Sequence, residues 1–145
     1  KAREVMTRLY NSTENGYPGD EDQGQTSSWY VLSALGFYSV CPGTDQYVLG
    51  SPLFKKVTVT MEDGRKFVIE AEGNSKDAVY INKVYVNGKL YTKSYLTWDD
   101  VKNGIDIEFV MSKKPNKKWA VAKDDIAPSV STEGKTVAYK HGMQL

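Results

Sequence analysis

The sequence is poor in the residues on which many catalytic and metal sites depend. Its 145 residues contain one cysteine, Cys41, and one histidine, His141. A single cysteine cannot form an intramolecular disulfide and is a poor anchor for a metal, so Cys41 is predicted to be a small core residue. His141 falls in a C-terminal tail with few apolar residues. Neither a Ser-His-Asp nor a Cys-His arrangement therefore has a suitable base.

Strong charge, long apolar runs and phosphate-binding motifs are also absent. The formal net charge is +1, so nothing favours nucleic acid or a membrane surface as a partner. No signal peptide, membrane-spanning run, P-loop or dinucleotide-binding glycine motif is present. The chain opens with Lys1 inside a helical pattern, and we expect it to be a piece of a larger protein.

The N-terminal third is predicted to be helical. Apolar residues have helical spacing over residues 2–10, and a second helix is predicted from about Gln23 to Leu35. Asp22 is the expected N-cap, because Gln25 follows three residues later as in a capping box, and Gly36 supplies the stop. Apolar or small residues surround this second helix, which predicts that it is buried on nearly all sides.

From Phe54 onward the apolar period is two, which predicts strands. A three-residue loop over residues 63–65 would pair Val59 with Ile69 and Met61 with Phe67. The Asn-Gly pair at residues 87–88 predicts a second hairpin, which joins residues 84–86 to residues 89–91.

The C-terminal part is predicted to lose regular structure. Thr97 is expected to cap a single helical turn, and residues 105–111 alternate as a further strand. From Lys113 we expect an irregular tail, with one strand around residues 136–139. The sequence thus predicts an α+β fold whose boundary lies near residues 41–50.

Three adjacent acids, Asp20, Glu21 and Asp22, stand before the second helix. The simplest interpretation is that Asp22 caps the helix while its neighbours favour the positive helix end. A calcium loop would need Gly at Gln25 and Glu at Val31, so an EF-hand is excluded. A catalytic interpretation also stands, because a tight turn and a helix N-terminus could fix an ionised carboxylate as a general base.

One long stretch of the sequence resembles a known family. Its segments are GYPGDEDQGQ (16–25), SWYV (28–31), ALGFY (34–38), CPG (41–43) and GSPLF (50–54), and VYVNGK (84–89) fits the downstream pattern. Together they resemble the C-terminal signature of glycoside hydrolase family 92, the calcium-dependent exo-acting α-mannosidases. The resemblance covers about residues 1–120, and its departures, at Thr26, Ser27 and Ser39, leave the acids intact.

The resemblance implies both a fold and a catalytic role. Residues 1–44 would be the last helices of a catalytic (α/α)₆ barrel, and residues 45–145 a mainly antiparallel, β-sandwich-like C-terminal module whose tail becomes irregular at about residue 113. In the family, the Asp-x-Asp of the signature carries the base function of an inverting reaction. That assigns Asp22 as the general base and Asp20 as its partner.

Other parts of the enzyme are expected outside this chain. The resemblance implies that the general acid and the calcium ligands lie in the parent, that the substrate is a mannose-containing glycan, and that the parent is periplasmic, secreted or at the cell surface. The isolated chain would then be catalytically silent. The alternative is a non-catalytic β-module that binds glycan or braces the catalytic domain, in which Asp20 and Asp22 would be occupied by helix capping.

Overall fold

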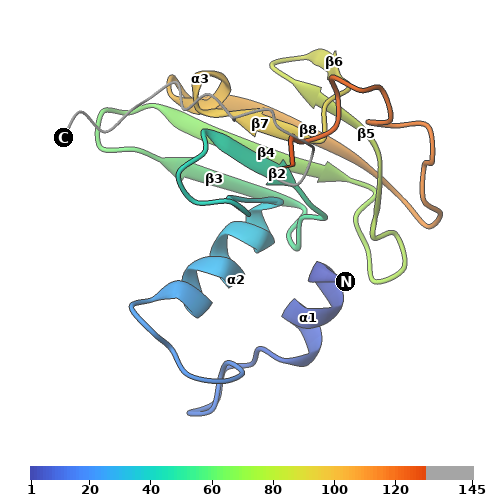
Figure 1. Cartoon of the computed structure of the whole chain (residues 1–145). Coiled ribbons are helices and arrows are strands. Elements are labelled where there is room, and N and C mark those ends of the chain that lie inside the picture. The colour runs from blue at the N-terminus through green and yellow to red at the C-terminus, as the bar shows by residue number, and fades with distance from the viewer. Residues whose placement is uncertain (130–145) are drawn as a thin grey trace.

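A computed structural model describes residues 1–129 and has an α+β fold. Two helices open the chain and two β-sheets follow (Figure 1). The helices are α1 (Ala2–Arg8), α2 (Gln25–Leu35) and the single turn α3 (Trp98–Val101). The strands are β1 (Phe37–Tyr38), β2 (Gln46–Leu49), β3 (Lys56–Thr60), β4 (Lys66–Glu72), β5 (Tyr80–Val86), β6 (Lys89–Tyr91), β7 (Tyr95–Thr97) and β8 (Ile105–Ser112).

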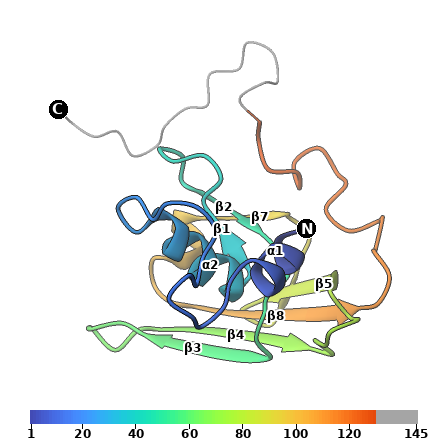
Figure 2. The ribbon, with the colours of Figure 1, turned by 90° about the horizontal axis from the view of Figure 1, so that it is seen from below.

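The strands form two sheets that face each other. The smaller sheet is antiparallel, in the order β1-β2-β7, and the larger has the order β3-β4-β8-β5-β6. In the larger sheet β4 and β8 are parallel, while every other pair is antiparallel. Figure 2 shows the larger sheet on one side and the smaller sheet above it, with α1 and α2 side by side against them. The mainly antiparallel, sandwich-like arrangement expected from the sequence is therefore present.

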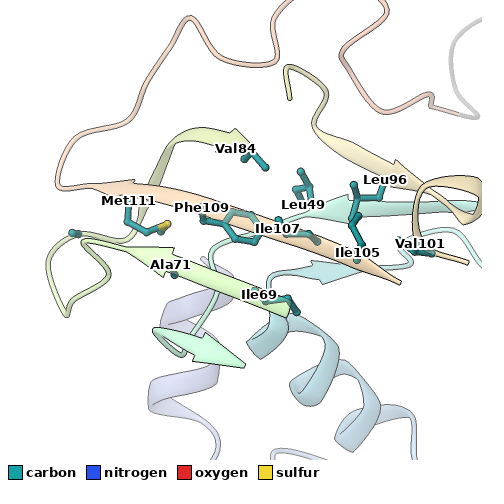
Figure 3. Packing of buried hydrophobic residues seen from close by; sticks show 11 residues of the cluster. Leu49, Ile69, Ala71, Val84, Leu96, Val101, Ile105, Ile107, Phe109 and Met111 are labelled. Atoms are coloured by element: carbon teal, nitrogen blue, oxygen red, sulfur yellow. The ribbon is translucent and has the colours of Figure 1, made fainter. Parts of the chain in front are cut away.

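The core lies between the two sheets. Along β8 the predicted alternation is confirmed, since Ile105, Ile107, Phe109 and Met111 are all buried while their neighbours are more exposed. Leu49 and Leu96 from the smaller sheet and Ile69 and Val84 from the larger belong to the same cluster (Figure 3). Burying these side chains against each other supplies the main favourable term for the fold.

The first hairpin has the predicted loop length but a different register. Met61 N–H donates to the Arg65 carbonyl at 2.8 Å, so residues 62–64 form the three-residue loop. Val59 therefore pairs with Phe67 and Val57 with Ile69, and the predicted Val59–Ile69 pairing is wrong. The loop begins one residue earlier than predicted, which shifts the pairing by two residues. Because the side-chain period is two, the same residues still share a face.

The second hairpin and the short helix are confirmed. Val84, Tyr85 and Val86 pair with Tyr91, Leu90 and Lys89 across the Asn-Gly turn. Thr97 caps α3 in a capping box, in which the Asp100 carboxylate accepts hydrogen bonds from the Thr97 N–H and hydroxyl at 2.8 Å each. Local turn and cap chemistry decided both features, which is why the sequence predicted them.

Residues 113–129 have neither helix nor strand, yet they pack onto the sheets. The Trp119 indole N–H donates to the Tyr91 carbonyl at 3.2 Å, and the ring contacts the core. Asn116 donates to the Asn82 carbonyl at 2.8 Å. The segment is irregular as predicted, but side-chain contacts fix it. The strand predicted around residues 136–139, and His141, lie outside the described residues.

Two predictions about burial are wrong. Cys41 is exposed rather than in the core, because it follows β1 in a surface turn whose Thr44 N–H donates to the Cys41 carbonyl. Helix α2 is not buried all round: Val31 is 56% exposed, and only Ser33 and Ala34 of the helix are buried. Within the described residues, only one face of this largely apolar helix is covered by other parts of the chain.

Polar and aromatic contacts fix the helices to the rest of the chain. The Asn74 side chain, itself buried, accepts from the Arg3 guanidinium at 2.8 Å and donates to the Leu53 carbonyl at 3.1 Å. At the other end of α1, the Tyr10 ring stacks on the Trp29 ring of α2 with centroids 5.6 Å apart. Helix α2 ends at Gly36, whose left-handed φ of 100° terminates it as predicted. These contacts fix the position of α2, whose N-terminus carries the acids.

Candidate functional site

The predicted acids lie in the loop that leads into α2. Asp20 and Asp22 are exposed and Glu21, between them, is half-buried. Residues 20–22 belong to no helix or strand and stand directly before the left-handed pair Gln23 and Gly24 that leads into α2. The two aspartates are thus more exposed than the glutamate that separates them.

The carboxylate that caps the helix is Glu21. Its Oε1 accepts from the Thr26 N–H at 3.0 Å, and its Oε2 accepts from the Ser27 N–H at 2.8 Å and from the Ser27 hydroxyl. The predicted capping box is wrong, because the N-cap is Gly24 and no Asp22 side-chain bond closes it. Glu21 reaches two of the backbone donors that the first helical turn leaves unpaired.

The predicted cap fails because two residues turn the chain sharply before the helix. Gln23 and Gly24 have φ angles of 55° and 77°, both left-handed. Gly24 adopts this conformation at little cost, whereas Gln23 does so only when the surrounding contacts impose it. The turn makes Gly24 the N-cap and brings the side chain from three residues earlier, Glu21, over the helix end.

The Asp20 and Asp22 side chains remain without partners. Among residues 1–129 neither carboxylate makes a hydrogen bond or ion pair, although their backbone carbonyls accept from the Thr26 hydroxyl and the Gln25 N–H. The two carboxylates are thus available for solvent or for a ligand, while their backbone is held at the helix N-terminus.

The hydrogen bonds to Glu21 stabilise its ionised form. They lower the pKa of Glu21, chiefly through the Ser27 hydroxyl and then through the backbone N–H groups of Ser27 and Thr26. A pKa depressed by folding stabilises the fold above the unfolded value, about 4.3, and this contribution is lost as pH falls through the folded value.

We expect the first turn of α2 to loosen in acid. In a pH titration followed by NMR, the Glu21 carboxyl should titrate below about 4.3, and the Thr26 and Ser27 amide signals should shift in the same step. Glu21→Gln, which removes the titrating carboxyl and keeps an oxygen acceptor, is the control variant. An amide response in this pH range that persists in Glu21→Gln, or its absence from the parental chain, would contradict the cap.

An aromatic residue just after the end of α1, Tyr10, contacts the first turn of α2. The Tyr10 hydroxyl donates to the Thr26 carbonyl at 3.2 Å, and burial, with a smaller contribution from the Glu21 charge, raises the pKa of Tyr10. A hollow of about 510 Å³ lies beside it, lined by Tyr10, Tyr17, Ser27 and Tyr30 among others. Asp20 and Asp22 do not line this hollow.

The described residues do not fit a metal cage. Residues 1–129 hold no group of three or more His, Cys, Asp or Glu side chains placed to bind one ion, and calcium requires six to eight oxygen ligands. Asp20 and Asp22 alone do not meet that requirement. In the same part of the chain, no helix has the length and apolar character needed to cross a membrane.

The sequence singled out Asp20 and Asp22 and assigned the helix cap to Asp22. The structure gives the cap to Glu21 instead. The spacing from Asp22 to Gln25 matched a capping box, and only the left-handed pair at residues 23–24 overrides it. The signal that could have found Glu21 is the Gly at position 24, which permits such a turn.

Comparison with known structures places this geometry in a family. A family 92 alpha-mannosidase from Bacteroides thetaiotaomicron superposes with a TM-score of 0.86 and 42% identity, covering 96% of this chain and 19% of that one. It is also known in complex with mannoimidazole. A family 92 inverting mannosidase from the same organism matches with a TM-score of 0.80 and 48% identity, over 88% of this chain and 17% of that one.

Sequence comparison agrees with the structural comparison. An uncharacterized secreted glycosidase from Arthroderma benhamiae is 28% identical over 133 residues, which is 90% of this chain and 17% of that protein. The chain thus spans less than a fifth of the length of these relatives. The model of the glycosyl hydrolase family 92 catalytic domain matches residues 1–113. The fold, the acidic loop before α2 and these matches together show that the chain belongs to glycoside hydrolase family 92.

Proposed function

We propose that this chain is the C-terminal portion of an inverting exo-acting α-mannosidase and contributes its general base, Asp22, with Asp20 as partner. The observation that carries the assignment is that only one of the three acids, Glu21, caps the helix. Glu21 occupies the helix N-terminus, so Asp20 and Asp22 keep exposed carboxylates without partners. The alternative, a non-catalytic module, required these two aspartates to be occupied by capping, and the cap at Glu21 weighs against it.

The substrate class follows from the relatives. Two structural relatives are named as mannosidases, one of them as inverting, and one has been studied with mannoimidazole bound. We propose by extension that the parent of this chain hydrolyses α-mannosidic linkages of mannose-containing glycans. Because a relative is named as a secreted glycosidase, we propose a periplasmic, secreted or cell-surface location.

The chemistry asked of Asp22 is proton removal from water. As the water oxygen bonds to the anomeric carbon, Asp22 accepts the water proton, and a carboxylic acid on the opposite face protonates the departing glycosidic oxygen. Inverting enzymes separate the two carboxyl groups by roughly 6.5–9.5 Å so that the water fits between them. Asp20, two residues away, would orient that water or share its proton. The acid belongs to a part of the parent outside this chain.

We propose that calcium, the cofactor that the family resemblance implies, is bound by parts of the parent outside this chain. We also propose that residues 1–44 are the last helices of a catalytic (α/α)₆ barrel and that residues 45–145 form the β-rich C-terminal module that packs against it. On this division, the 145-residue chain alone lacks the acid and is inactive.

The stereochemistry of the product tests the proposal. Given an aryl α-mannoside, the longer protein should release β-mannose first, followed by slow equilibration to the α anomer, as seen by proton NMR in the first minutes. The 145-residue chain alone should release nothing above the buffer control. Formation of α-mannose first would exclude the inverting mechanism, and the absence of any hydrolysis of α-mannosides by the longer protein would exclude the substrate class.

A further inference from the structure

We propose that Glu21 is a positioning residue: its carboxylate clamps the acidic loop onto α2 and thereby sets the direction of Asp20 and Asp22. The inference rests on the proposed function, because it concerns the same reaction. It differs in assigning a role to the acid that the catalytic assignment leaves unused. Three hydrogen bonds, to Thr26 N–H, Ser27 N–H and the Ser27 hydroxyl, form the clamp.

The clamp acts on both aspartates at once because of their order in the chain. Glu21 stands between the two aspartates, so the hydrogen bonds that hold its carboxylate against α2 restrain the backbone on both sides of it. The Asp22 carboxylate makes no hydrogen bond or ion pair among residues 1–129 that could hold it. Its direction therefore depends on its own rotamer and on the backbone, which the neighbouring Glu21 restrains.

A second feature of the loop makes the clamp necessary. Gln23 is a non-glycine residue with a φ of 55°, directly followed by Gly24 at 77°. A left-handed non-glycine residue persists only where surrounding contacts impose it, and such residues cluster at functional sites. The hydrogen bonds of Glu21 span this pair, because they link Glu21, on one side of it, to Thr26 and Ser27, the second and third residues of α2, on the other.

Tyr10 extends the clamp to α1. Its hydroxyl donates to the carbonyl of Thr26, the residue whose N–H Glu21 accepts. The ring also stacks on Trp29 one turn further along α2. The helix end that receives Glu21 is thus itself fixed from outside, so the carboxylate docks against a rigid partner rather than a fraying helix end.

Small displacements of a general base have large effects on rate. A misplacement of about 1 Å can cost on the order of 10²-fold. We therefore expect Glu21→Ala, in the longer protein, to lower kcat by about 10- to 100-fold on an aryl α-mannoside, with KM changed less than about twofold. Glu21→Gln keeps an amide oxygen as acceptor but loses the charge. Its kcat should therefore lie between that of Glu21→Ala and that of the unsubstituted protein.

A matched control separates positioning from stability. Thr97→Ala removes a comparable helix cap, that of α3, in a different part of the chain. Both variants should lower the melting temperature by similar amounts, but only Glu21→Ala should lower kcat when both are assayed well below their melting points. If Glu21→Ala fails to fold, the comparison of Glu21→Gln with Thr97→Ala carries the test in the same way.

The outcomes distinguish this inference from the proposed function. If Asp22→Asn is strongly impaired while Glu21→Ala and Glu21→Gln keep the parental kcat, the positioning role is overturned and the general base stands. Equal kcat losses in Glu21→Ala and Thr97→Ala would likewise reduce Glu21 to a structural cap. If Asp22→Asn keeps the parental kcat, the base assignment fails, and the positioning role fails with it.

Discussion

Asp22→Asn in the longer protein should lower kcat by about 10²–10⁴-fold on an aryl α-mannoside, the usual contribution of a general base. Asparagine has nearly the same shape, but its amide cannot accept the proton of the attacking water. The Asp22 side chain makes no hydrogen bond or ion pair among residues 1–129, so the substitution breaks no such interaction in this part of the fold. The loss should appear in kcat, with KM changed little, because the interaction is made in the transition state.

Two companion variants sharpen the measurement. Asp20→Asn should reduce kcat less than Asp22→Asn if Asp20 orients the water and Asp22 removes its proton. Asp124→Asn, at an exposed position far along the chain, should leave kcat unchanged and so controls for the loss of one negative charge. A loss of only a few-fold for Asp22→Asn would show that Asp22 is not the base, and a larger loss for Asp20→Asn would exchange the two roles.

The β-structure was predictable where short-range chemistry decides it. The alternation of Ile105, Ile107, Phe109 and Met111, the Asn-Gly turn and the cap at Thr97 each depend on residues a few positions apart. The register between β3 and β4 was not predictable to the residue. Both candidate registers place the same side chains on the same face, so the hydrophobic pattern cannot choose between them. Only the position of the turn, at residues 62–64, decides.

The acids before α2 are visible in the sequence, but their arrangement could not be predicted from it. An Asp-x-Asp before a helix is visible in the sequence, and so is the family signature around it. Which of the three acids faces the helix depends on the backbone of Gln23 and Gly24, whose left-handed angles no side-chain pattern specifies. The exposure of Val31 shows a related limit. An apolar residue indicates burial, but the sequence alone does not say which surface covers its side chain.

The largest effect on stability is expected at Phe109. Its side chain is fully buried on β8, which lies between β4 and β5 in the larger sheet. The ring also reaches the end of α2: a Cβ placed on Gly36 would lie 3.2 Å from its terminal carbon. Phe109 therefore lies close to the helix end and belongs to the core cluster to which both sheets contribute (Figure 3). Removing it would leave a cavity that the surrounding strands cannot close without losing their pairing.

Phe109→Ala should accordingly lower the free energy of unfolding by about 3–5 kcal/mol. The measurement is urea denaturation of the 145-residue chain followed by tryptophan fluorescence, with the midpoint shifted and the slope unchanged. Phe54→Ala is the matched control, because Phe54 is 49% exposed and its removal should cost less than about 1 kcal/mol. Equal losses in the free energy of unfolding for the two variants would contradict a core centred on β8. The expected difference would show that Phe109 stabilises the packing of the sheets and of the end of α2, the helix that the acidic loop precedes.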